Sequence, residues 1–311
     1  MPGSDQLSRG PSQLLVSIGN FGAARPVEPA EPRATCLLLL DLDSLRTRWV
    51  DVGCNNEPLV AGLGLCADDD CIYHVSLAKA DSRTILTVLE RETFGVEGVQ
   101  QLPEVSDVHS IQRLGDELMV VSTGTDEIVA YHLDGCVATD AHVVWSPTRS
   151  GRDTHHVNSL AVIEGEVLCS AFGEKDGDSW TTAKDGYLHN VTTDRRLLAG
   201  LRQPHTVTAH HGRLYYCNSQ EGTVSSPDGV VAYLAGYSRG LAFGPDGTMY
   251  AATSLSRRPD RPAGDSTEFL NLGDPGDLNG RCAVVKVPTA RARLEIGLST
   301  AGYEIYDLLM C

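Results

Sequence analysis

The sequence predicts an all-β protein, a six-bladed β-propeller that forms a single domain over residues 1–311. Three observations lead to this prediction. Short β-rich runs are separated by turn residues, and glycine and proline are frequent, with 31 and 15 residues in a chain of 311. Two motifs recur along the chain in phase with each other. The two ends of the chain supply complementary parts of one blade, which would close the ring.

The first motif is an apolar run that ends in a small polar residue. It occurs at Leu15-Val16-Ser17, Tyr73-His74-Val75-Ser76, Val120-Val121-Ser122, Leu168-Cys169-Ser170, Tyr216-Cys217-Asn218 and Ala251-Ala252-Thr253. The second motif precedes five of these runs, at Leu63-Gly64-Leu65, His109-Ser110-Ile111, Asn158-Ser159-Leu160, His205-Thr206-Val207 and Arg239-Gly240-Leu241. Most intervals are about 45–50 residues, the length of a four-stranded propeller blade. A pair of β-sandwiches, the alternative, would not require two motifs in phase.

The remaining strands follow the same plan. Tight hairpin turns join the first strand of a blade to the second at 115–117, 164–166, 211–213 and 245–247. Third strands are predicted at 128–133, 186–191 and 229–234, and fourth strands at 142–145 and 196–201.

The N-terminal blade lacks an innermost strand of its own. Its second, third and fourth strands are predicted at 13–18, 36–42 and 47–52, and the C-terminal tail at 302–309 can supply the first. Mixing both termini in one blade removes an open sheet edge. We expect residues 1–12 to form a flexible tail, and we expect 256–280 to form a long loop near one mouth of the central channel.

Composition narrows the possible functions. The formal net charge is -16, so we expect no binding to nucleic acid or to an anionic membrane surface, which both require a basic face. Met1 to Pro11 is polar, and the aliphatic run from Leu37 to Leu40 is too short to span a bilayer. The nine cysteines form no CxxC pair. Their scattered placement favours reduced, mostly buried thiols and a cytoplasmic location.

The repeat also predicts where a site lies. The innermost strands of a propeller line its channel, so residues at the same phase converge near one mouth. His109, Asn158, His205 and Arg239 share this phase in successive blades, and His155 and His156 lie just upstream of Asn158. The alternative is that these polar residues only bond one another, the backbone and channel water.

We assign expected roles to these residues. As ligands of a divalent metal ion we expect His109, His155 and His205, because neutral imidazoles suit transition metals. Asp107, Asp153, Glu221 and Glu304 are candidate oxygen ligands or bases. The expected catalytic residues are His156, Glu221 and Arg239, with His156 or Glu221 as proton shuttle. The expected substrate-binding residues are Asn158, Trp180, Asn218 and Arg239, although Trp180 could equally pack between blades.

Several motifs resemble an uncharacterised bacterial family of six-bladed propellers, a conserved domain of unknown function. They are the run from Asp153 to Leu160, Ser170-Ala171-Phe172-Gly173, Gln203-Pro204-His205, Ser238-Arg239-Gly240-Leu241-Ala242-Phe243 and Glu304-Ile305-Tyr306-Asp307. The resemblance covers about residues 100 to 311. More remotely, the chain is similar to gluconolactonase-like and strictosidine-synthase-like propellers. That similarity implies a metal or a catalytic carboxylate at the channel mouth. Histidines stand here where the lactonases have carboxylate ligands.

Two hypotheses about function follow. The first is an enzyme whose channel histidines, with a metal, catalyse hydrolysis, elimination or isomerisation and cyclisation of a small oxygenated metabolite. The second is a non-catalytic propeller that binds a protein or a small molecule, with structural histidines.

Overall fold

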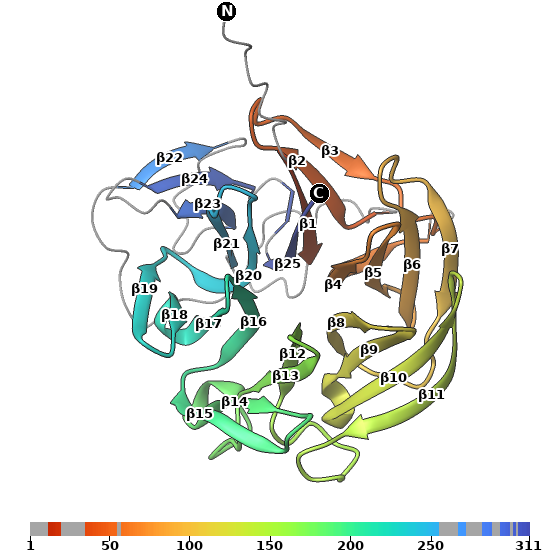
Figure 1. Ribbon diagram of the computed structural model, residues 1–311, viewed down its shortest axis with the longest axis vertical. Helices are drawn as coiled ribbons and strands as arrows, with labels where there is room; N and C mark the ends of the chain where they lie inside the picture. Colours follow the sequence, from red (N-terminus) through yellow and green to blue (C-terminus); the bar gives the residue numbers. More distant parts are fainter. Residues whose placement is uncertain are drawn as a thin grey trace, which may run out of the picture.

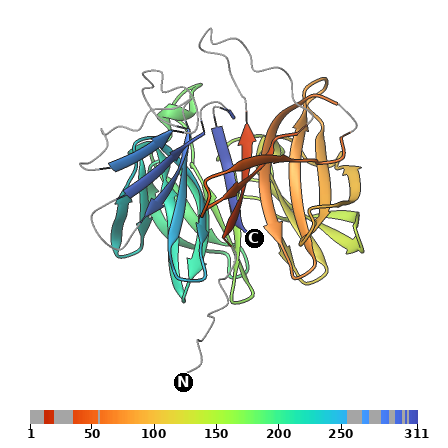
Figure 2. The ribbon, with the colours of Figure 1, turned by 90° about the horizontal axis from the view of Figure 1, so that it is seen from above.

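The structure, a computed structural model, describes residues 12–19, 35–54, 57–254, 267–271, 282–287, 293–298, 301–302 and 304–311. Its sheets stand around a central axis (Figure 1), and their strands run upright when the ring is seen edge-on (Figure 2). Helix within these ranges is limited to three single-turn 3-10 segments, η1 (Thr123–Thr125), η2 (Trp180–Thr182) and η3 (Ser219–Glu221). The expected all-β propeller is confirmed.

The largest sheet combines both ends of the chain. It contains β1 (Gln13–Gly19), β2 (Leu37–Asp41), β3 (Thr47–Val50), β4 (Leu59–Ala67), β5 (Cys71–Ala78), β6 (Thr84–Glu90), β7 (Val96–Gln101) and β25 (Glu304–Met310). β1 and β4 meet at the pair Gly19–Ala61, so the sheet divides into the units β25-β1-β2-β3 and β4-β5-β6-β7. β25 pairs antiparallel with β1, which confirms that the two termini share one blade.

Each of the other sheets comes from one continuous stretch of chain. The first contains β8 (Val108–Leu114), β9 (Glu117–Ser122), β10 (Glu127–Asp134) and β11 (Val137–Trp145). The second contains β12 (Val157–Ile163), β13 (Glu166–Ala171), β14 (Gly186–Asn190) and β15 (Arg195–Leu201). The third contains β16 (Pro204–His210), β17 (Arg213–Asn218), β18 (Thr223–Ser226) and β19 (Gly229–Tyr233).

The last sheet contains β20 (Tyr237–Phe243), β21 (Met249–Ser254), β23 (Ala283–Val287), β24 (Arg293–Gly297) and β22 (Thr267–Asn271), in that spatial order. β22 pairs in parallel with β24 at the outer edge, and it falls inside the range 256–280 that we expected to be a loop. The rest of that range lies outside the described residues. The same is true of the expected N-terminal tail, except for Ser12.

The core lies between neighbouring sheets rather than within one layer. Val88 of β6 packs in one cluster with Ile111 and Val120 of the next sheet. Another cluster joins Val16 of β1 to Val284 of β23 across the closing point of the ring. Burying such a side chain contributes about 1.5–3 kcal/mol. Because both faces of a blade are covered, the second strands are unbroken apolar runs, as the first sequence motif requires.

Side chains also link the innermost strands across blades. The Ser110 hydroxyl accepts a hydrogen bond from the Leu160 amide at 3.2 Å, and the Ser159 hydroxyl accepts one from the Val207 amide at 3.3 Å. Thr206 accepts one from the Gly240 amide at 2.9 Å. These hydrogen bonds between blades explain the Ser or Thr at the centre of three copies of the second sequence motif, since a short hydroxyl reaches the neighbouring backbone.

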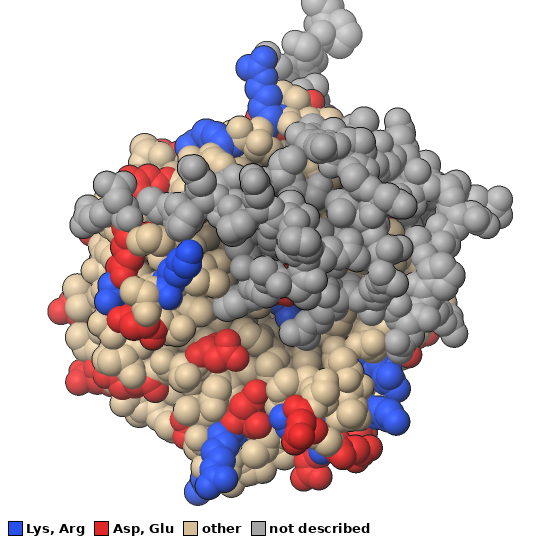
Figure 3. Space-filling model, turned by 180° about the vertical axis from the view of Figure 1, so that it is seen from behind, with Lys and Arg blue, Asp and Glu red and all other residues tan. Residues whose placement is uncertain are grey.

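Charged side chains of both signs are spread over the described surface (Figure 3). On the face shown in Figure 3, acidic side chains are spread over the rim with basic ones between them. Among the described residues, no helix has the length and apolar character that crossing a membrane requires.

Candidate functional site at the channel mouth

The innermost strands carry β-bulges at nearly the same position. The ladder between the first and second strands skips His109 in β8 and Asn158 in β12, whereas in β16 and β20 His205 and Arg239 are paired and the register shifts directly after them. A bulge bends its strand and re-aims side chains at or beside it. All four side chains line a cavity at the axis of the ring.

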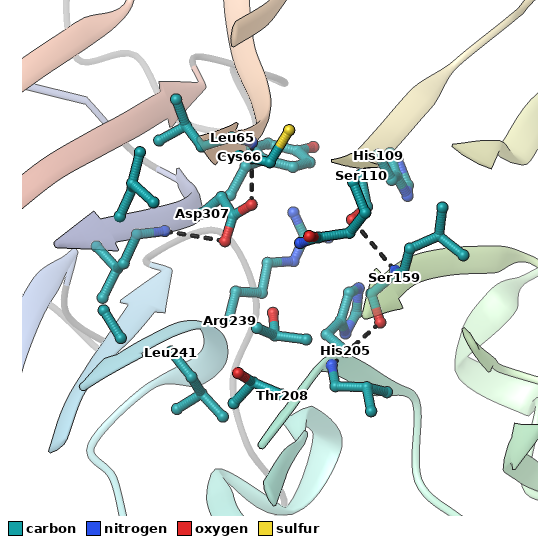
Figure 4. A pocket seen from close by; sticks show the side chains of 18 of the residues that line it. Leu65, Cys66, His109, Ser110, Ser159, His205, Thr208, Arg239, Leu241 and Asp307 are labelled. Atoms are coloured by element: carbon teal, nitrogen blue, oxygen red, sulfur yellow. Dashed lines mark hydrogen bonds between the residues drawn. The ribbon is translucent and has the colours of Figure 1, made fainter. Parts of the chain in front are cut away.

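A cavity of about 400 Å³ lies on that axis. His109, Asn158, His205 and Arg239 line it, together with Tyr306 of β25. His109, His205 and Arg239 are labelled around the cavity in Figure 4. The structure therefore brings together the four residues that the repeat phase aligned. Ser110, Ser159 and Thr206 also line the cavity, and these polar groups suit an oxygen-rich molecule.

His156 does not line the cavity itself; its ring packs against His109, which does, and it forms a pair with Asp153. Its Nδ1 lies 3.1 Å from Asp153 Oδ2, and a carboxylate can only accept, so Nδ1 donates the proton. The side chain is buried, and Nε2 has no hydrogen-bond partner among the described residues. Burial lowers the pKa of His156 to about 4, although Asp153 acts to raise it. The ring is therefore neutral at pH 7, with its lone pair on Nε2.

His109 lies against His156, with ring centroids 5.1 Å apart in an edge-to-face arrangement. Its Nε2 lies 3.6 Å from Asp107 Oδ1, and its buried Nδ1 has no hydrogen-bond partner in the described part of the chain. Burial alone would raise the pKa of Asp107, but His109, His156 and Arg239 together lower it to about 2. The mouth thus holds two imidazoles, each facing a carboxylate.

His205 is held in one tautomer. Its Nδ1 lies 2.8 Å from the Ser219 hydroxyl, which donates its own proton to the Ser238 carbonyl at 2.6 Å. Nδ1 must therefore carry the proton. The Phe172 ring separates His205 from His156, with centroid distances of 5.0 Å and 4.4 Å to the two rings. This apolar spacer keeps the two imidazoles from acting on one atom.

Arg239 is the largest fully buried side chain among the described residues, at 1% exposure. Its Nη1 lies 3.5 Å from Glu304 Oε2, and the guanidinium lies 4.4 Å above the Tyr306 ring. Burial alone would lower the pKa of Arg239, but Tyr306, Glu304 and Tyr237 raise it above its ordinary value. Neither Nε nor Nη1 has a hydrogen-bond partner among the described residues. A charged guanidinium with N–H groups to spare can therefore bind an oxygen in the cavity.

Asp307 is a cavity residue that the sequence reasoning missed. Its two carboxyl oxygens accept hydrogen bonds from the Leu65 and Leu308 amides, each at 3.0 Å. Burial raises the pKa of Asp307 to about 7, against these bonds. The sequence did contain a feature that could have identified Asp307, because Tyr306-Asp307-Leu308 is a sixth copy of the second sequence motif. There a carboxylate stands where the other copies have Gly, Ser or Thr.

Trp180 and Asn158, expected to bind substrate, have different surroundings. The Trp180 ring lies 4.8 Å from His156, and its carbonyl accepts a hydrogen bond from Gln203 at 2.7 Å. Trp180 thus forms a wall of the mouth. The Asn158 amide donates to the His156 carbonyl at 3.0 Å and accepts from Ser170 at 2.7 Å. Its hydrogen bonds hold the His156 turn rather than point to a ligand.

His155 does not join the other expected metal ligands. The ring packs against Tyr187, with a centroid distance of 6.2 Å, and Nδ1 lies 3.1 Å from the Thr154 hydroxyl. The left-handed backbone of His156, with φ +54°, separates the directions of the two neighbouring side chains. Within the described residues, no three His, Cys, Asp or Glu side chains are arranged to hold a metal. The residues present therefore do not fit the expected ligand set of His109, His155 and His205.

Glu221 and Asn218 lie away from the cavity and bond each other. The Asn218 amide donates to Glu221 Oε2 at 3.0 Å, and its oxygen accepts from the Arg202 amide at 2.7 Å. Neither residue lines the cavity. Their contacts order the turn around η3. The structure gives no direct contact between Glu221 and the channel histidines that it was expected to assist.

The assembled mouth can move a proton and stabilise an oxyanion. His156 offers a neutral Nε2 backed by a carboxylate, which is the arrangement of a general base. Arg239 offers N–H donors in a site with little water, where such donors stabilise developing charge well.

Comparisons with known proteins agree with the fold. A family model described as "Domain of unknown function (DUF4915)" matches residues 92–311. No curated protein matches the chain significantly.

Solved structures with the same fold include three propellers of low sequence identity. A chain of the nidogen/laminin complex is 10% identical, with a TM-score of 0.58, and the match covers 95% of this chain and 97% of that one. A provisionally named 6-phosphogluconolactonase of Bacteroides fragilis NCTC 9343 is 13% identical, with a TM-score of 0.54 and coverages of 100% and 84%. A luciferin-regenerating enzyme is 11% identical, with a TM-score of 0.51 and coverages of 80% and 76%. These likenesses show the fold alone.

Proposed function

The chain belongs to the family of that domain of unknown function, and we propose that this member is a hydrolase whose site lies at the channel mouth. Its substrate is a small, uncharged ester or lactone. The single observation that carries the proposal is the His156–Asp153 pair: its Nε2 is buried without a hydrogen-bond partner among the described residues, and its ring packs against His109, which lines the same cavity as Arg239. Two of the propellers with a similar fold are named as enzymes, which supports a catalytic use of the fold.

In this proposal His156 is the proton shuttle. Its neutral Nε2 takes a proton from a water molecule as the water oxygen bonds to the carbonyl carbon. Asp153 then stabilises the imidazolium through the Nδ1 hydrogen bond. When the carbon–oxygen bond to the leaving group breaks, Nε2 returns the proton to the leaving oxygen. His109 Nδ1, buried next to this ring, holds the attacking water by accepting its second O–H.

Arg239 supplies the oxyanion-binding group. As water adds, negative charge develops on the carbonyl oxygen, and Nε–H and Nη1–H donate to it. Glu304 keeps the guanidinium oriented from one side at 3.5 Å. Removing one donor of this kind typically costs about 10²–10³ in rate.

The charge of the mouth indicates a substrate without net negative charge. Among the described residues, three carboxylates stand near the Arg239 guanidinium and the two imidazoles: Asp107, Asp153 and Glu304. Glu304 already neutralises much of the Arg239 charge. A carboxylate or phosphate on the substrate would therefore be repelled, since like charges in a site with little water disfavour each other.

A paired substrate panel tests the proposal. Uncharged esters and lactones are offered beside analogues that carry a carboxylate or a phosphate, and release of acid is followed at constant pH. We expect turnover of members of the uncharged set, with loss of that turnover in Asp153→Asn. Turnover confined to the charged set, or uncharged turnover that survives Asp153→Asn, would contradict the proposal.

A further inference from the structure

The loop that carries Asp153 and His156 forms hydrogen bonds of its own at exposed residues, such as that from the Arg149 amide to the Ser146 hydroxyl at 3.0 Å. It follows β11, and its residues from Thr148 to Arg152 are exposed before β12 begins. His156 adopts a left-handed backbone with φ +54°, a region that residues other than glycine adopt only uncommonly. Contacts from neighbouring elements also hold the loop, such as the Gly173 amide, which donates to the His155 carbonyl at 3.0 Å.

The preceding blade adds further support through Asp126. Its side chain is completely buried. Oδ2 accepts from the Thr154 amide at 2.6 Å, the Thr154 hydroxyl at 2.8 Å and the His155 amide at 2.6 Å. Oδ1 accepts from the Val157 amide at 3.1 Å. The loop thus wraps around one carboxylate, and these bonds offset the cost of burying its charge.

The equivalent turn two blades on lacks this carboxylate. Asp126 directly follows η1 and Gly222 directly follows η3, each as the C-cap residue in the left-handed conformation. In both turns a hydroxyl bonds to the next blade, from Thr123 to the Val157 carbonyl and from Ser219 to the Ser238 carbonyl, each at 2.6 Å.

The hydroxyl–carbonyl hydrogen bond between blades therefore forms without an aspartate at the end of the turn. Glycine is the default residue for a left-handed position because it has no Cβ, and aspartate is tolerated there, so the turn itself does not require Asp126. Its presence is explained by the bonds it makes to the loop above.

We propose that Asp126 is a positioning residue, which fixes the 153–157 loop so that Asp153 meets His156 at the channel mouth. The inference rests on the proposed function for its catalytic consequence, but the geometric part stands without it. Asp126 touches no reacting atom. It acts through the backbone amides on both sides of His156.

The test compares three full-length variants. Asp126→Asn replaces one acceptor oxygen with an amide that faces N–H donors, and Asp126→Gly reproduces the η3 turn and keeps its backbone favourable. Thr123→Val is the matched control, since it removes the bond between blades from the same turn and leaves the carboxylate. The readout is the ¹⁵N–¹H resonance of the His156 Nδ1–H, assigned by its loss in His156→Asn.

We expect this resonance in the wild type and in Thr123→Val, and its loss through exchange with water in both Asp126 variants. On a hydrolysed substrate, the Asp126 variants lower kcat by about 100-fold with little change in KM, the cost of a misplaced catalytic group. An unchanged His156 resonance in folded Asp126→Gly would overturn the inference. If the resonance is lost but His156→Asn leaves hydrolysis intact, the positioning role stands and the proposed function fails.

Discussion

Two imidazole–carboxylate pairs in one blade have the same nitrogen–oxygen distance, through Nδ1 of His156 and Nε2 of His189, and different surroundings. His156 and Asp153 are 3.1 Å apart, and so are His189 and Asp194. Asp194 is 83% exposed, and His189 stacks on Trp145 on the outer part of the blade, at 4.9 Å. His156 instead has an orphaned, buried Nε2 beside a second imidazole. The pair itself is thus common surface chemistry, and burial next to a cavity is what indicates a site.

The largest expected effect is on kcat, which should depend on the His156–Asp153 pair and not on the His189–Asp194 pair. Asp153→Asn should lower kcat by about 10²–10⁴-fold, the usual contribution of a positioned general base, because an amide no longer stabilises the imidazolium. The matched change Asp194→Asn should leave kcat unchanged. Initial rates on one substrate of the uncharged panel decide the point. Equal losses of kcat in the two variants would show that burial of the His156–Asp153 pair does not give it a special role in catalysis.

A second prediction extends the comparison to ion pairs. Glu304→Gln leaves the buried Arg239 without its charged partner at 3.5 Å, so the free energy of unfolding should fall by about 3–5 kcal/mol. The control is the exposed pair Arg213–Asp228, where Asp228→Asn should cost less than about 1 kcal/mol. Urea denaturation gives both values. A small cost at Glu304 would mean that water reaches the guanidinium.

The third prediction concerns pH. Asp307 has a pKa of about 7 in the folded protein and an ordinary value near 3.8 when unfolded. The folded state therefore binds more protons between these values, and the contribution of Asp307 to stability falls as pH rises from about 4 to about 7. The variant Asp307→Asn does not lose stability in this way. The free energy of unfolding of the variant should therefore rise relative to that of the wild type between about pH 4 and about pH 7, by at least about 1.4 kcal/mol, the free energy of one pKa unit.

Denaturation of wild type and Asp307→Asn at pH 4.5 and pH 8 measures this difference. The exposed carboxylate Asp194, changed to Asn, serves as the control, and its difference from the wild type should not follow this pattern. A constant difference between wild type and Asp307→Asn would contradict a buried, nearly neutral carboxyl in the channel.

Much of the fold could be predicted because propeller blades repeat. The phase of His109-Ser110-Ile111 and its relatives located the innermost strands, and the missing first strand of the N-terminal blade predicted the pairing of β25 with β1. The same phase placed His109, Asn158, His205 and Arg239 around one cavity. Residues at the same position of successive repeats occupy equivalent places around the ring, which is why residues far apart in the sequence could be grouped.

The details of the site needed the structure. Neighbouring residues on a regular strand point in opposite directions, but His155 and His156 lie on a loop with a left-handed turn, which sequence spacing does not predict. Asp126 acts from another blade through backbone amides, which leave no side-chain pattern. Asp307 could have been found, because Tyr306-Asp307-Leu308 carries the motif. Its place at the end of the chain concealed the repeat.

The central claim is that His156, and not its neighbour, supplies the base of the site. The direct test measures kcat/KM of His156→Asn and His155→Asn in parallel. Asparagine tolerates the left-handed backbone at 156 and keeps a donor toward Asp153, so both variants should fold. The account predicts a loss of at least about 100-fold for His156→Asn and wild-type activity for His155→Asn. Full activity in His156→Asn, or a loss confined to His155→Asn as a metal ligand at 155 would require, would contradict it.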